Sequence, residues 1–217
     1  PVPGLPNRTP KNLVTNLFTA DPLPVMKAHT EGYVSAVRDR LDEADVVHLH
    51  ALQTTYLASV LDGDPPTVLR FNNVKAEIYR QFARYTNNPA KAAYAYLKYA
   101  KTKRYEGTIP EASPLSLAIT DEDRDRLRDY GAGGRIEVLP AGVDLAQYDP
   151  SEPNPDARRI TFFGSMDYHP NEDAVRWFVE NVLPSIRERR PDVTFEVVGK
   201  NPSERVRALD DREDVRV

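Results

Sequence analysis

Apolar residues form short runs along the first two thirds of the chain, and polar stretches with helical periodicity separate them. Four of these runs are strand-sized and rich in apolar and β-branched residues. They predict β-strands over residues 44–50, 65–71, 113–120 and 135–140. The stretches around them predict helices over residues 30–43, 51–63, 75–105 with a break near 87–91, and 121–131.

The same alternation restarts after a proline-rich stretch. It predicts strands over residues 160–164, 193–199 and 215–217, and helices over residues 171–189 and 203–209. Residues 1–29 are also rich in proline and predict an irregular loop. The clearest helix signals are Thr120, which predicts an N-cap with Asp123 three residues on, and Gly131, which predicts the end of the same helix.

Strands that alternate with helices indicate an α/β protein with parallel sheets. Most of the predicted strands are uniformly apolar, so we expect helices on both faces of each sheet. The restart of the pattern indicates two sheet units with a linker between them. We place the first domain at residues 1–143, the linker at 144–157 and the start of the second domain at 158–217.

Composition excludes several kinds of site. The 217 residues include no cysteine, which excludes disulfides, thiolate metal sites and thiol nucleophiles. A formal net charge of −4 argues against nucleic-acid binding by the chain as a whole. The apolar runs are too short to cross a membrane and no signal peptide is visible, so we expect a cytoplasmic protein.

The predicted helix that follows residue 87 is basic although the chain is acidic. Between Lys75 and Tyr105 eight residues are Lys or Arg, and Glu77 alone is acidic. Helical spacing places five basic and aromatic residues on one face: Lys91, Tyr94, Lys98, Lys101 and Tyr105. We expect the opposite face to pack: Ala92, Ala93, Tyr96, Leu97 and Ala100. The basic face is either simply solvated or binds an anionic membrane surface or a phosphate-bearing acceptor, which would make the protein peripheral at the inner face of the membrane.

A predicted strand of the second unit ends in glycine and leads into a polar loop. In "FFGSMDYHPNED" this loop follows Gly164 and carries Ser165, Asp167 and His169. Asn171 is suited to cap the next helix, whose free N–H groups and dipole favour an anion such as a diphosphate. The alternative is a plain strand–helix connection with proline in the first turn.

The next strand repeats this arrangement. In "FEVVGKNPS" it ends in Gly199, and Lys200 follows. Ligands of open parallel sheets bind beyond the carboxyl ends of the strands. The two glycines would therefore form one crevice with Lys200 beside it as a cation.

The first unit carries polar residues where two of its strands end. His48 and His50 point to the same side of a strand, a spacing that suits metal ligation, but the sequence has only four histidines in all. We expect His48 to be packed and His50 to take a polar role in a cleft. Arg70 and Asn72 share one face of the next strand, which indicates a cavity, whereas Asn72 and Asn73 also suit a turn.

Three segments resemble the group 1 (family 4) glycosyltransferases. "RIEVLPAGVDLAQYDP" is similar to their interdomain linker, "ITFFGSMDYHPNEDAVRWF" to the opening of their nucleotide-binding domain, and "LAITDEDRDRLRDYG" to the strand and helix before the linker. The resemblance implies the GT-B fold of two Rossmann-like domains, both incomplete in this chain. It also implies a hexosyltransferase of polysaccharide biosynthesis that moves a sugar from a nucleotide sugar to a glycan or lipid-linked acceptor. Retention of anomeric configuration and the lack of a metal or other cofactor belong to the same expectation.

The resemblance also implies roles for individual residues. The donor would be bound by residues of the second domain: Gly164, Ser165, Asp167, His169, Asn171, Gly199 and Lys200. His50 and Asn72 would be the catalytic residues. The acceptor would lie against the first domain, near five residues: Arg70, Asn73, Lys91, Lys98 and Lys101.

Departures from the family pattern leave other functions open. Relatives often have histidine where this chain has Asn72, and many have Arg and Lys in the loop that here holds Asp167 and His169. The family's glutamate pair and its N-terminal glycine-rich loop have no counterpart in these residues, so we expect a fragment that is inactive by itself. The alternatives are a non-catalytic binding or interaction module and a nucleotide-sugar epimerase.

Overall fold

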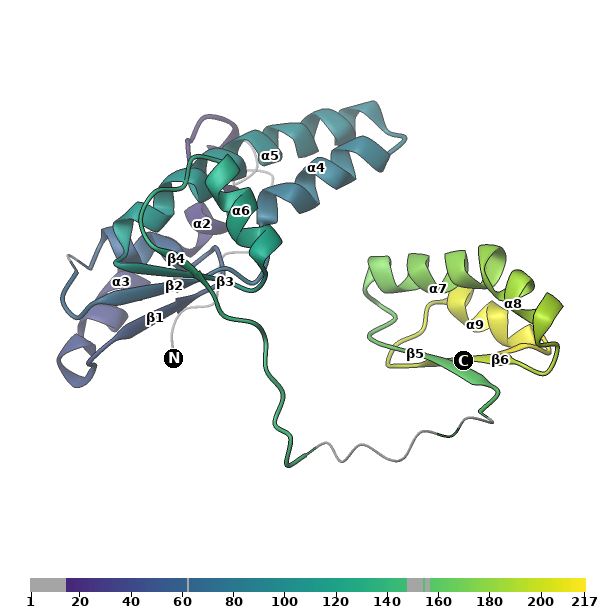
Figure 1. Ribbon diagram of the computed structural model, residues 1–217. Coiled ribbons are helices and arrows are strands. Elements are labelled where there is room, and N and C mark those ends of the chain that lie inside the picture. The colour runs from purple at the N-terminus through teal and green to yellow at the C-terminus, as the bar shows by residue number, and fades with distance from the viewer. Residues whose placement is uncertain (1–14, 62, 148–153, 155–156) are drawn as a thin grey trace. The chain divides into compact units, whose positions relative to one another are not determined.

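The computed structural model describes residues 15–61, 63–147, 154 and 157–217, which form two compact units (Figure 1). The contacts divide the chain between Val143 and Asp144. Each unit holds its own parallel sheet. The fold class is therefore α/β with parallel sheets, as predicted, and it is consistent with Rossmann-like domains of the GT-B kind.

The first unit is built on a four-stranded parallel sheet with the order β1–β2–β3–β4. Its strands are β1 (Val47–His50), β2 (Thr67–Arg70), β3 (Leu115–Ala118) and β4 (Ile136–Val138). His50 lies opposite Arg70, and Arg70 lies opposite Leu117. The carboxyl ends of β1, β2 and β3 therefore meet at one edge of the sheet, where the polar residues of the sequence follow.

α2 (Leu23–Ala28) and α3 (Glu31–Arg38) precede β1, α4 (Lys75–Tyr85) and α5 (Pro89–Thr108) connect β2 to β3, and α6 (Asp121–Asp129) connects β3 to β4. Threonine side chains cap the starts of two of them, α3 and α6. The Thr30 hydroxyl accepts from the Tyr33 amide, and that of Thr120 accepts from the Asp123 amide. α6 ends as predicted, because Gly131 adopts a φ of +95° that other residues reach only with strain.

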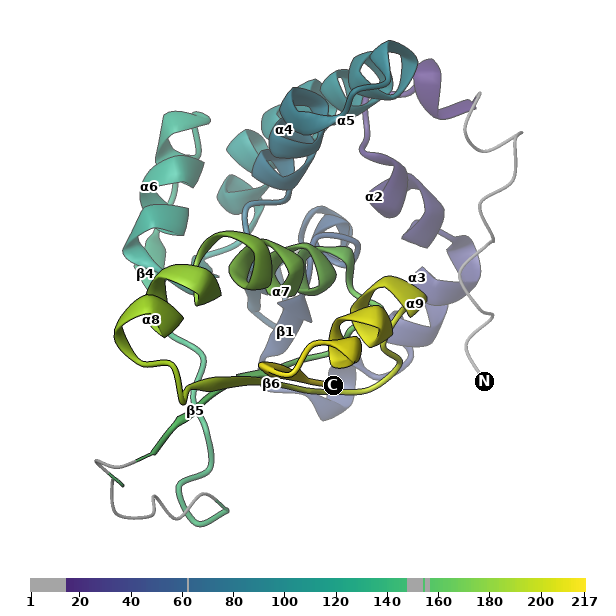
Figure 2. The same cartoon turned by 90° about the vertical axis from the view of Figure 1, so that its right-hand side faces the viewer.

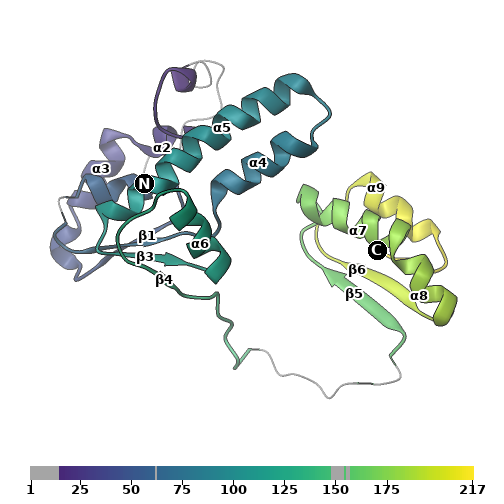
Figure 3. The same ribbon diagram turned by 45° about the horizontal axis from the view of Figure 1, so that its top comes forward.

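α4 and α5 form an antiparallel hairpin whose tip extends past the sheet (Figures 1 and 3). Asn88 caps α5 by accepting from the Lys91 amide at 3.0 Å, and Pro89 is the first residue of the helix. The predicted break near residues 87–91 is the turn of this hairpin.

The segment 51–63, which we expected to be a helix, folds differently. Its described part contains the 3₁₀ turn Thr55–Ser59 and no α-helix. The Thr54 hydroxyl donates to the His50 carbonyl at 2.8 Å, and the Thr55 hydroxyl donates to the Leu52 carbonyl at 2.8 Å. These side chains take carbonyls that a helix would need.

The N-terminal expectations also need correction. α2 lies within the stretch expected to be irregular, and residues 1–14 fall outside the described part. The helix expected over residues 30–43 ends at Arg38, and a 3₁₀ turn, Leu41–Glu43, follows it.

The burial of α5 is the reverse of the expected one. Three residues of the face expected to pack are exposed: Ala93, Tyr96 and Ala100. Residues on another side of the helix are buried: Ala95, Thr102, Glu106 and Gly107. The basic face lies beside them and is half-buried from Tyr94 to Tyr105, because long Lys and Tyr side chains pack their apolar parts while their polar ends reach out.

The second unit holds a three-stranded parallel sheet with the order β5–β6–β7. Its elements are β5 (Arg159–Phe163), α7 (His169–Asn181), α8 (Leu183–Arg189), β6 (Thr194–Val198), α9 (Glu204–Arg207) and β7 (Val215–Arg216). The single helix expected over residues 171–189 is thus two helices that meet at Val182. Pro184 explains the break, because it has no N–H to continue the helical hydrogen bonds.

α7, α8 and α9 lie on the same side of this sheet (Figures 1, 2 and 3). Their core consists of buried residues of both layers, among them Val175, Val179, Leu183, Phe195 and Val197. Alternate residues of β5 are exposed, and Phe163 is 84% exposed. For the described residues of this unit, the expectation of helices on both faces is therefore wrong.

Candidate functional site

His50 and Asn72 meet where β1 and β2 end. The Nε2 atom of His50 lies 2.7 Å from Oδ1 of Asn72. An amide oxygen only accepts, so the His50 ring donates from Nε2. Both side chains are exposed. The structure therefore brings the two expected catalytic residues into direct contact.

His48 does not take the packed position that we expected. It is exposed, and its ring stacks on that of His50 with 6.0 Å between the ring centroids. His48 lies on β1, which is the edge strand of the described sheet, and the side of β1 that carries His48 and His50 faces solvent. Among the residues that the structure describes, no group of three or more His, Asp or Glu side chains is arranged to hold a metal ion.

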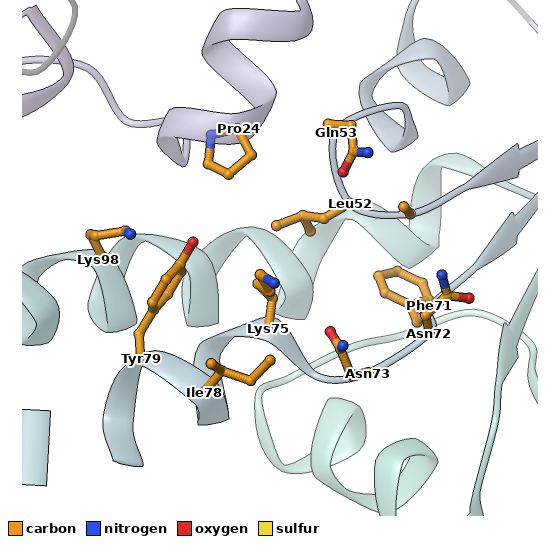
Figure 4. A pocket seen from close by; sticks show the side chains of 11 residues that line it. Pro24, Leu52, Gln53, Phe71, Asn72, Asn73, Lys75, Ile78, Tyr79 and Lys98 are labelled. Carbon is orange, nitrogen blue, oxygen red and sulfur yellow. The ribbon is translucent and has the colours of Figure 1, made fainter. Parts of the chain in front are cut away.

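A cavity of about 460 Å³ lies beside Asn72 (Figure 4). Its lining comes from the turn after β1, the loop after β2 and the first turns of α4, together with Pro24 of α2 and Lys98 of α5. Asn72 and Asn73 both line it, whereas Arg70 is half-buried and lies outside this lining. Ala51, which also lines the cavity, has a φ of +72°, a strained value for alanine.

The three lysines expected on the acceptor side have three different environments. The Lys98 ammonium lies 3.9 Å from the centroid of the Tyr79 ring, at the edge of the cavity. Lys101 instead donates to the backbone carbonyls of Asn16 and Thr19, and burial lowers its pKa. Lys91 is exposed and lines a second, neighbouring groove.

Glu106 is a buried residue of this region that sequence reasoning missed. Its carboxylate accepts from the amides of Lys75 at 2.6 Å and Ala76 at 3.0 Å, and so caps α4, whose preceding residue Val74 has no capping side chain. Burial raises the pKa of Glu106 to about 7, against the opposing effect of the two N–H groups. The sequence signal for it was indirect: a helix start without a local cap.

In the second unit, Gly164 and Gly199 lie side by side at the ends of β5 and β6. The Gly164 amide donates to the Val198 carbonyl at 3.0 Å. A Cβ atom at position 199 would lie 1.8 Å from the Gly164 carbonyl oxygen, so no side chain fits there. Gly199 is therefore required by the close approach of the two segments, whereas a Cβ atom at position 164 would meet the Asn171 side chain at 2.8 Å.

Asp167 ties the two loops together beyond these glycines. It accepts from the Ser165 hydroxyl at 2.5 Å and from the Asn201 amide at 3.1 Å. The bond from Ser165, then that from Asn201, holds the pKa of Asp167 below its usual value, and the Lys200 charge acts in the same direction. Asn201, with a φ of +54°, is a second residue that sequence reasoning missed.

Asn171 is not the N-cap that we expected. α7 begins at His169, which is exposed, and Tyr168 precedes it without a side-chain cap. Asn171 lies in the first turn, and its side chain donates to the Ser165 carbonyl at 3.0 Å. The proline at position 170 has no N–H, and the Asn171 amide donates to the Tyr168 carbonyl, so this helix start offers fewer donors than expected.

Comparison with known proteins bears on the second unit. Residues 157–217 match the protein family described as glycosyl transferases group 1, a range that runs from β5 to β7. No curated protein matches the chain.

None of the described helices is both long and apolar enough to cross a membrane. The family match and the parallel α/β fold together support a group 1 glycosyltransferase of the GT-B kind.

Proposed function

We propose that this chain forms part of a family 4 glycosyltransferase that moves a sugar from a nucleotide sugar to a glycan or lipid-linked acceptor, with retention of anomeric configuration. The observation that carries the proposal is the match of residues 157–217 to group 1 glycosyltransferases. The matched range includes the two strands that end side by side at Gly164 and Gly199.

In this proposal the donor diphosphate binds beyond β5 and β6. Parallel sheets bind ligands at this edge, and glycine lets the backbone approach a phosphate closely. Lys200 supplies a positive charge there, and the dipole of α7 adds a smaller one. Fixed positive charge of this kind stabilises the diphosphate as it leaves the sugar.

The role of Asp167 is then indirect. Its negative charge would repel a diphosphate, and both of its oxygens already accept hydrogen bonds. We infer that it positions Ser165, Asn201 and the neighbouring Lys200, so it is a positioning residue and not a direct ligand of the donor.

On the acceptor side, His50 and Asn72 are the residues that we expect to meet the sugar hydroxyl. In the neutral ring, donation from Nε2 leaves Nδ1 without a proton, and that atom can accept a hydrogen bond from a hydroxyl group. Asn72 supplies an amide N–H₂ group as a donor. Their contribution in this proposal is the orientation of the acceptor.

Calorimetric titration of UDP, GDP and their sugars into the 217-residue protein tests the proposal. We expect at least one nucleoside diphosphate to bind, and Lys200→Gln to weaken it about tenfold, since a charge-assisted contact is lost. Arg189→Gln is the matched control, because Arg189 is an exposed cation at the end of α8, which leads into the start of β6 and not from its carboxyl end. An affinity that Lys200→Gln and Arg189→Gln lower equally, or no binding of any of the ligands, would contradict the proposal.

A further inference from the structure

The α4–α5 hairpin carries an apolar groove of about 340 Å³, which we call the hairpin groove. α4 contributes Ile78, Tyr79 and Phe82, and α5 contributes Lys91, Tyr94, Ala95 and Lys98. Almost all of its accessible lining is apolar. Phe82 is 53% exposed and Ile78 is 39% exposed, so apolar side chains face solvent here. Apolar surface that stays open along a groove is typical of a binding site for an apolar group.

The hairpin groove adjoins the cavity beside Asn72. The two share three lining residues: Ile78, Tyr79 and Lys98. Figure 4 shows these residues along one side of the cavity, with Lys75 between them and Asn73. The apolar hairpin groove therefore leads into a cavity of the first unit whose lining is partly polar and partly apolar.

Positive charge distinguishes the hairpin groove and the adjoining cavity from an ordinary apolar groove. Lys75 and Lys98 line the cavity, and Lys91 lies along the groove. No Asp or Glu is among the described residues that line either space. The combination fits a ligand with an anionic group at one end and an apolar chain at the other.

We propose that the acceptor of the first unit is a lipid phosphate. Its phosphate lies in the cavity between Lys75 and Lys98, and its chain lies along the hairpin groove over Phe82. A sugar that extends from the phosphate would then lie toward Asn72 and His50. The acceptor role rests on the proposed function, whereas the binding of a lipid phosphate does not.

A free glycan is a poorer fit to the same surface. Its hydroxyl groups would have to give up water for a wall that offers almost no hydrogen-bond partners. It would also leave Phe82 exposed. The apolar groove fits a ligand that carries a chain.

Titration of citronellyl phosphate, a short isoprenoid phosphate, into the 217-residue protein tests this inference, with inorganic phosphate and citronellol as comparison ligands. We expect citronellyl phosphate to bind at least about tenfold more tightly than either, because only it fills both spaces. Phe82→Ser and Lys98→Gln should each weaken its binding about tenfold. Circular dichroism confirms that each variant is folded.

Tyr96→Ser and Arg104→Gln are the matched controls, because both residues are exposed on α5 and line neither space. They should leave the affinity unchanged. Equal affinity for citronellyl phosphate and inorganic phosphate, or equal losses in test and control variants, would overturn the inference. Binding only to vesicles of phosphatidylcholine with phosphatidylglycerol would overturn it too, since the hairpin would then bind a membrane surface.

The result also separates the two proposals. Nucleotide binding that depends on Lys200 without binding of citronellyl phosphate leaves the donor site in place and removes the lipid acceptor. Binding of citronellyl phosphate without nucleotide binding removes the transferase and leaves a lipid-phosphate site.

Discussion

The ring of His50 lies 2.7 Å from the side-chain oxygen of Asn72, across two neighbouring parallel strands. This contact exists because β1 and β2 are in register, with His50 opposite Arg70, so that Asn72 follows directly beyond the end of β2. It gives the imidazole a fixed partner and a preferred tautomer in an exposed position.

Asn72→Ala should remove the preference of the His50 ring for the tautomer that carries its proton on Nε2. In the wild-type protein, nitrogen NMR of the neutral imidazole should report protonated Nε2, and the variant should show a mixture of tautomers. The stability should change by no more than about 1 kcal/mol, because the pair is exposed. The same ring spectrum in both proteins would show that Asn72 does not set the tautomer.

Glu106 should make the stability of the first unit depend on pH. Its pKa is raised from 4.5 to about 7 in the folded protein, mainly by burial, so the folded state binds this proton more tightly than the unfolded state. Its contribution to the free energy of unfolding is therefore fully present below pH 4.5 and is lost as the pH rises through about 7. The expected size is about 3 kcal/mol over this range.

Chemical denaturation at a series of pH values checks this dependence. Glu106→Gln does not titrate at this position, so it should lack the fall in stability that the wild type shows between these pH values. Glu43→Gln is the control, since Glu43 is exposed, and it should keep the wild-type slope. A parallel slope in wild type and Glu106→Gln would contradict the assignment.

Gly199→Ala should destabilise the second unit by about 1–3 kcal/mol. The added methyl group meets the Gly164 carbonyl oxygen, so the segments that follow β5 and β6 must move apart. Thermal unfolding measures the effect. Gly32→Ala is the contrasting substitution, because a Cβ atom there meets nothing within 4 Å and alanine favours the helix. An equal response to the two substitutions would mean that the close approach at Gly199 is not required.

Tyr94→Phe should be neutral or should stabilise the protein by up to about 1 kcal/mol. The Tyr94 hydroxyl is buried without a hydrogen-bond partner in the described part of the chain. Tyr56→Phe provides the comparison, because the Tyr56 hydroxyl donates to the Ala28 carbonyl at 3.0 Å and its loss should cost about 1 kcal/mol. Urea unfolding of both variants measures the difference, and a large loss at Tyr94 would show a partner for that hydroxyl.

Local signals allowed most of the strands and several helix ends to be predicted. Thr120 and Gly131 delimit α6 through contacts a few residues away, and four apolar runs gave the four strands of the first sheet. The same local reasoning failed at residues 51–63, where Thr54 and Thr55 bond to nearby carbonyls. Composition alone does not tell whether such hydroxyls will do so.

Features that depend on distant residues could not be predicted. Glu106 caps α4 from 31 residues further along the chain. The prediction of the packed face of α5 was wrong because helical spacing does not distinguish half-buried lysines from solvated ones. In the second unit, Asn201 joins Asp167 across 34 residues. The positions of Gly164 and Gly199 beside each other were predictable, since both follow parallel strands.

The central claim is that the ends of β5 and β6 bind the diphosphate of a nucleotide sugar. Titration of UDP and GDP followed by amide NMR tests it most directly, because it detects weak binding and locates it. We predict shifts concentrated at Gly164–Asp167 and Gly199–Asn201, and their loss in Lys200→Gln. Shifts confined to other parts of the chain, or none with either nucleotide, would contradict the claim.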